Sequence, residues 1–109
     1  MRKNSSGPLH KIPIANLTKR EMEKMAMTLH GGYTVTVFET EGGFWTLEIA
    51  FHGQEIQRYG IETMRGILKV WRNLSDAIMF AQENCAKAEN VYVDFRGWRL
   101  SKLDAAGAN

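Results

Sequence analysis

The chain has 109 residues, of which 44% are hydrophobic and 24% charged, and its formal net charge is +2. This composition is ordinary for one globular domain with a sizeable core and excludes a disordered chain. No apolar run approaches the length of a membrane span. The basic start is not followed by the apolar stretch that a secretory signal requires. A single cysteine excludes an intramolecular disulfide and a cysteine-rich zinc site. We therefore expect one cytoplasmic domain without membrane contact.

The first residues are rich in cations, histidine, serine, glycine and proline. Proline disfavours helix in the residue before it, and small polar residues do not build a core. We predict a flexible basic arm over residues 1–15, a single domain over 16–100 and a flexible tail over 101–109.

The first predicted helix covers residues 19–30. Thr18 and Glu21 have the spacing of a capping box, in which each side chain bonds the backbone N–H of the other. Glycines follow the helix and favour its end. The apolar residues that recur at helical spacing on one face are Met22, Met25, Ala26 and Leu29.

Three methionines lie in this helix. Methionine fills cores, but it is also common on surfaces that adapt to several partners. Core packing is the first interpretation. The alternative is a groove for a protein partner or a dimer interface, with Met22, Met25 and Met27 as the partner-binding residues.

The segment 33–51 alternates apolar and polar residues on both sides of a glycine pair, which predicts a β-hairpin. A two-residue loop would mix apolar and polar side chains on each face. A three-residue loop over 41–43 pairs Val37 with Leu47 and collects the large apolar residues on one face, so we predict this register. The other face, which we expect to meet water or a partner, carries Thr34, Thr36, Thr46 and Glu48.

The rest of the chain predicts three further strands and a second helix. The strands are a weak one over 54–60, a fourth over 67–71 and a last one over 91–95. Asn73 is the predicted helix cap, with Asp76 in the first turn. The apolar stripe of this helix consists of Leu74, Ala77, Ile78, Ala81, Cys85 and Ala88.

The predicted order, α-β-β-β-β-α-β, indicates an α+β fold. We expect a two-layer sandwich with a mainly antiparallel sheet and two helices packed on one face. Strands 67–71 and 91–95 are candidate neighbours, and a parallel pair there would need a right-handed crossover.

No residues form a recognisable catalytic constellation. The histidines, His10, His30 and His52, lack ligand spacing, and Cys85 lies on an apolar stripe. The glycine pairs lack the context of a phosphate loop. The acids near the hairpin, which we interpret as solvated, are Glu39, Glu41, Glu48 and Glu55. We predict no enzyme, no cofactor and no metal; a small enzyme using these acids and His52 is the least favoured hypothesis.

Basic residues alternate with aromatic ones in three places, a pattern suited to phosphates and stacked bases. The predicted nucleic-acid-binding residues are Arg58, Lys69, Arg72, Arg96, Arg99 and, in the arm, Lys11. Our leading hypothesis is a non-enzymatic binding module, a regulatory or accessory protein associated with nucleic acid, with a homodimer as an option. The alternative is a protein–protein adaptor or dimerisation module that uses the first helix or the hairpin surface.

Overall fold

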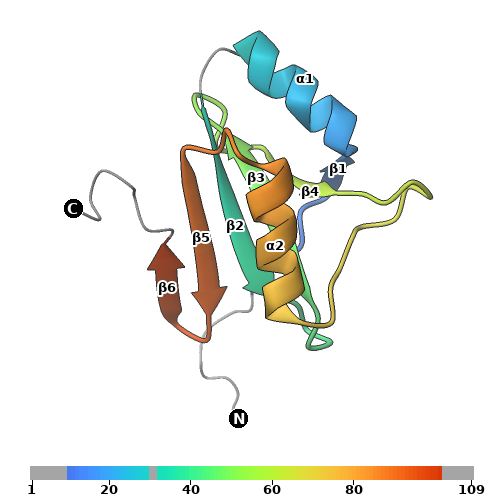
Figure 1. Cartoon of the computed structure of the whole chain (residues 1–109), viewed down its shortest axis with the longest axis vertical. Helices are drawn as coiled ribbons and strands as arrows, with labels where there is room; N and C mark the ends of the chain where they lie inside the picture. The colour runs from blue at the N-terminus through green and yellow to red at the C-terminus, as the bar shows by residue number, and fades with distance from the viewer. Residues whose placement is uncertain (1–9, 30–31, 102–109) are drawn as a thin grey trace.

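The computed structural model describes residues 10–29 and 32–101. This part of the chain is a small α+β domain with two helices and one mixed six-stranded sheet (Figure 1), so the predicted α+β class is confirmed. The elements are β1 (Ala15–Leu17), α1 (Lys19–Leu29), β2 (Tyr33–Glu39), β3 (Trp45–Phe51), β4 (Arg58–Ile61), α2 (Leu74–Asn84), β5 (Asn90–Phe95) and β6 (Trp98–Ser101).

The strands lie in the order β1-β4-β3-β2-β5-β6. The pairs β1–β4 and β2–β5 are parallel, and the other pairs are antiparallel. Both edge strands, β1 and β6, were absent from the predicted order. Most of the predicted arm and tail, residues 1–9 and 102–109, lies outside the described residues.

The predicted strand over 67–71 is wrong. After Ile61 the chain makes a tight loop, closed by a 2.7 Å bond from the Thr63 N–H to the Ile67 carbonyl. It returns to the sheet only at isolated positions, where Trp71 exchanges two 2.7 Å backbone bonds with Trp45 of β3. The segment has the composition of a strand, but the tight loop before it prevents a continuous ladder of hydrogen bonds to the sheet.

Residues 67–71 and 91–95, which the sequence leaves open as possible neighbours, do not pair. The second segment belongs to β5, which pairs in parallel with β2, from Thr34–Asn90 to Phe38–Asp94. Since β3 lies on the far side of β2, two strands separate Trp71 from β5. Only the tertiary pairing decides which strand a crossover joins, because the alternation within each strand is compatible with several neighbours.

The capping box at the start of α1 forms as predicted. The Glu21 carboxylate accepts a 2.9 Å bond from the Thr18 N–H, and the Thr18 hydroxyl accepts a 3.0 Å bond from the Glu21 N–H. These bonds satisfy donors that a helix start leaves free. The helix is confirmed through Leu29; His30 lies outside the described residues.

The hairpin register is confirmed. Val37 pairs with Leu47, and the hydrogen bond that closes the turn joins the Thr40 N–H to the Phe44 carbonyl. The loop therefore covers residues 41–43, with its last glycine at φ 84°. A left-handed residue at this point is what the three-residue loop requires.

The cap of α2 differs from the prediction. Asn73 occupies the cap position, but its side chain makes no capping bond and instead donates a 3.5 Å bond to the Asp76 carboxylate. The helix ends at Asn84, so Cys85 and Ala88 follow it, although both remain buried. The apolar stripe thus continues past the helix into the connection to β5.

One hydrophobic core joins both helices to one face of the sheet. The most enclosed members include Val35, Leu47 and Ile49, all with no exposed surface. α2 packs against β2 and β3, and α1 packs against β1. In Figure 1, α2 lies over β2 and β3, whereas β5 and β6 lie to one side of it.

The opposite face of the sheet is less exposed than predicted. Thr36, Thr46 and Glu48 are buried there, each with at most 6% of its surface accessible. Two contacts explain part of this burial: the His10 ring stacks on Phe38 at 3.9 Å between centroids, and the Thr46 hydroxyl bonds the Lys69 carbonyl. Chain segments far away in sequence cover a face whose own residues look suited to water.

Candidate functional site

Three of the six predicted nucleic-acid-binding residues form ion pairs within the domain. Arg58 lies 3.5 Å from the Glu48 carboxylate, and the Arg96 Nε donates a 3.4 Å bond to Glu39. Arg99 donates two bonds, of 2.7 and 2.8 Å, to the Asp94 carboxylate. A cation that already bonds a carboxylate has less of its charge available for a phosphate.

The Arg99–Asp94 pair has the shortest distances of these contacts. The two residues face each other across β5 and β6, and the guanidinium also lies 4.7 Å from the centre of the Tyr92 ring. Hydrogen bonds from Arg99 hold the pKa of Asp94 below its ordinary value, and the same bonds raise the pKa of Arg99. A bidentate pair of this kind fixes the side chain to its own sheet.

The six cations do not gather on one surface. Arg58 and Arg99 pair in register with Ala50 and Asp94, on the face opposite the helices. The side chain of Lys69 instead lies beside α2, over the Phe80 ring. The other three cations lie in further separate places. Arg96 lies in the β5–β6 turn, Arg72 is exposed before α2, and Lys11 is exposed next to His10.

One of them, Lys69, does take part in a cationic groove. This open groove, with a volume of about 610 Å³, has an apolar floor that includes Ile61 and Phe80. Its cations are Lys19 from the start of α1, Arg65 from the 63–67 loop, and Lys69. We call this region the basic groove. Glu62 is the one acid in its lining, so positive charge dominates.

Lys69 is held over aromatic rings at this groove. Its ammonium lies 5.4 Å from the centre of the Trp71 ring and 5.7 Å from that of Phe80. The two rings are themselves in contact, with centroids 5.0 Å apart. The sequence indicated Lys69 through its aromatic neighbour, but Lys19 and Arg65 carried no such signal because they come from distant segments.

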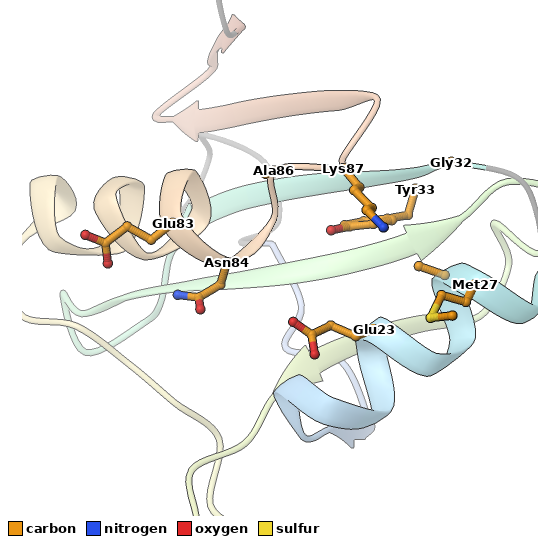
Figure 2. A pocket seen from close by; sticks show the side chains of 9 residues that line it. Glu23, Met27, Gly32, Tyr33, Glu83, Asn84, Ala86 and Lys87 are labelled. Carbon is orange, nitrogen blue, oxygen red and sulfur yellow. The ribbon is translucent and has the colours of Figure 1, made fainter.

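A second hollow lies between α1 and the end of α2 (Figure 2). It has a volume of about 590 Å³, and its residues are Glu23, Ala26, Met27, Gly32, Tyr33, Glu83, Asn84, Ala86 and Lys87. We call it the interhelical cleft. Of the predicted partner-binding methionines, Met22 is a core residue, Met25 packs against the core, and Met27 lines this cleft with 69% of its surface exposed.

Tyr33, which lines the interhelical cleft, contacts a second titratable group, the thiol of Cys85. Burial raises the pKa of the Tyr33 phenol far above its ordinary value, and its contact with Cys85 raises it further. Burial also raises the pKa of the Cys85 thiol to about 11. Both groups are therefore neutral near pH 7, and Cys85 lacks the thiolate character of a reactive cysteine.

The sequence did not indicate a polar cluster on the face opposite the helices. His10 Nε2 lies 2.8 Å from the Glu48 carboxylate, and its Nδ1 lies 3.6 Å from Asp94. Glu48, which we interpreted as solvated, is thus buried between His10 and Arg58. His10 and Glu48 are 38 positions apart in the sequence, so no local pattern indicates their contact. His52 has a separate partner, Glu89, at 3.0 Å.

Two general properties complete the description. Among residues 10–29 and 32–101, no cluster of three or more His, Cys, Asp or Glu side chains is placed to hold a metal ion. Neither described helix has the length and apolar character that crossing a bilayer requires.

Comparisons with protein-family models, curated proteins and solved structures find no match to this chain.

Proposed function

We propose that this protein is a non-enzymatic binding module of the cytoplasm, a two-layer α+β sandwich that contacts single-stranded nucleic acid at the basic groove. The observation that carries this proposal is the convergence of Lys19, Arg65 and Lys69 around an apolar floor with an aromatic ring. Cations neutralise phosphates, and aromatic or apolar surface receives unstacked bases. A regulatory or accessory role is consistent with such a site.

Ion pairing supports this choice among the predicted cations. Arg58, Arg96 and Arg99 each contact an acid of the domain, whereas Lys69 contacts aromatic rings. A phosphate at the basic groove would therefore compete with fewer carboxylates. Of the predicted residues the proposal keeps Lys69, and it adds Arg65 from the same connection between β4 and α2 and Lys19 from the start of α1.

The test is fluorescence anisotropy with labelled single strands of DNA and RNA, about 12 nucleotides long, titrated over a salt series. Three neutralised phosphates predict a log–log salt slope of about −2. The double variant Arg65→Ala/Lys69→Ala should weaken binding about tenfold or more and make the slope shallower by about 1.4.

The matched control is Arg96→Ala/Arg99→Ala, which removes the same charge from paired positions. It should weaken binding much less than the groove variant. Equal losses would point to bulk charge instead of the basic groove. Absence of binding at low salt would reject nucleic acid as the partner.

The interhelical cleft favours a second candidate function, a protein–protein adaptor. Met27 is exposed at a hollow whose other apolar contributors include Ala26, Ala86 and the Tyr33 ring, which suits an apolar side chain of a partner segment. Met27→Lys should leave stability and nucleic-acid binding unchanged and remove such a complex. Met22→Lys should instead unfold the domain, because Met22 is only 1% exposed.

A further inference from the structure

The strand β6 is an open edge of the sheet. Among the described residues it pairs with β5 alone, at the end of the strand order. The turn before it has two residues, Arg96 at φ 47° and Gly97 at φ 91°. Residue pairs along an antiparallel ladder alternate between pairs that exchange backbone hydrogen bonds and pairs that do not. The pair that closes a two-residue turn, here Phe95 and Trp98, exchanges hydrogen bonds, so the next pair, Asp94 and Arg99, does not. The backbone N–H and C=O of Arg99 therefore point away from β5, toward the free edge.

The same strand carries an apolar patch. Trp98 is 71% exposed, Leu100 is 53% exposed, and the neighbouring Phe95 is 38% exposed. We call these three residues the β6 patch. Leu100 pairs with Val93, which packs against the core, so the patch lies on the same face as the helices. In Figure 1 no helix lies over β6, and β5 lies between it and the part of the sheet that α2 covers.

We propose that β6 pairs with β6 of a second copy of this chain, antiparallel about a two-fold axis, to form a reversible homodimer with a continuous sheet. Residues directly opposite in an antiparallel pair share a face. When Arg99 lies opposite Arg99 of the second copy, Trp98 of each copy lies opposite Leu100 of the other. This register joins the two β6 patches and uses the free backbone groups of Arg99.

Charge does not oppose this register. Two arginines facing each other across the axis would repel if they were free. Each Arg99 is instead bonded to its own Asp94, at 2.7 and 2.8 Å, and lies over the Tyr92 ring. The guanidinium therefore lies along its own sheet, and its charge is balanced there. Edge strands commonly avoid pairing by exposing an unpaired charge. Within the described strand, Trp98–Ser101, the one charged side chain is that of Arg99, and it is compensated.

The buried area sets the expected strength. A Trp and a Phe side chain bury about 150–250 Å² each when fully covered, so partly exposed Trp98, Phe95 and Leu100 from two copies, with the β6 backbone, bury on the order of 1,000 Å². This is at the lower end for a specific interface. It suits a dimer that dissociates in the micromolar range, with Trp98 as its main anchor.

The test is sedimentation equilibrium of the full chain from about 1 to several hundred micromolar. The weight-average mass should rise from 12.4 kDa toward twice that value. Leu100→Lys should raise the dissociation constant about thirtyfold or more, since it places a charge in the β6 patch. Trp98→Ser should act in the same direction without adding charge. Ile56→Lys is the matched control at a fully exposed residue outside the patch, and it should leave the constant unchanged.

Hydrogen exchange distinguishes strand pairing from face-to-face stacking. At high concentration the Arg99 amide should gain protection in the wild type and not in Leu100→Lys, with the folded state of each variant checked by urea unfolding. A constant mass of 12.4 kDa, a dimer that Leu100→Lys and Trp98→Ser leave intact, or a dimer with an unprotected Arg99 amide would each overturn the proposal. None of these results depends on nucleic-acid binding.

Discussion

The strands β3 and β6 use the same alternation and have opposite surroundings. On β3, Leu47 and Ile49 are completely buried, because α2 and the core cover them. On β6, Trp98 and Leu100 remain 71% and 53% exposed on the same side of the sheet. Alternation assigns a side chain to a face, and the helical cover decides whether that face is buried. The covered half therefore contributes more to stability than the half that carries β6.

The largest expected difference comes from removing one apolar side chain on each strand. Ile49→Ala should lower the free energy of unfolding by about 2–5 kcal/mol, because it leaves a cavity in a closed core. Leu100→Ala should change it by about 0.5 kcal/mol or less when measured at low protein concentration. Urea unfolding of both variants measures the difference. Similar losses would show that β6 is covered in the isolated chain.

Two glycines provide an intermediate comparison. Gly43 and Gly97 both have positive φ, at 84° and 91°, so replacing either with alanine should cost about 1 kcal/mol. In Gly43→Ala the cost should appear in global unfolding, because its hairpin is part of the core.

Gly97→Ala should act locally. Since β6 makes few buried contacts, its amides should exchange about fivefold faster while the amides of β3 change less. Hydrogen exchange read by NMR measures both sets of amides. Equal acceleration in β3 and β6 would mean that the two regions open as one unit.

The smallest expected effect is the pH dependence of the Arg99–Asp94 pair. Hydrogen bonds from Arg99 lower the pKa of Asp94 in the folded state, with a smaller contribution from His10. A lowered carboxyl pKa stabilises the fold above the unfolded pKa, and this contribution is lost as pH falls through the folded pKa.

The wild type should therefore exceed Asp94→Asn in stability above the ordinary pKa of an aspartate, about 3.9, and the two should converge as pH falls through the lowered pKa of folded Asp94. Because the pair is partly exposed, the difference should stay below about 1 kcal/mol. Urea unfolding at several pH values measures it. A difference that grows toward low pH would contradict this assignment.

Some parts of the fold could be predicted because their causes are local. The capping box needs only Thr18 and Glu21 three residues apart, and the hairpin register follows from which of two loops collects the apolar side chains. The segment 67–71 failed for the opposite reason. Its composition suits a strand, but the tight turn before it leaves only isolated bridges. The two-residue turn at Arg96 and Gly97, flanked by alternating residues, was a signal for β6 that we did not use.

The candidate sites were less predictable than the fold. Lys69 was indicated by its aromatic neighbour, but its companions in the basic groove, Lys19 and Arg65, come from separate segments. The pairing of Arg96 with Glu39 spans 57 residues, so nothing local showed that this cation is compensated. Sequence patterns show which residues carry charge, whereas ion pairing depends on which strands become neighbours.

The sequence by itself determined the α+β class, both helices, the register of the β2–β3 hairpin and the face that becomes core, because spacing, capping and alternation act over a few residues. The tertiary structure alone decided that β5 pairs with β2, that His10 covers Phe38, and that β6 has β5 as its single neighbour among the described strands. These features depend on contacts between distant segments, whose free energy is gained only when the whole chain packs.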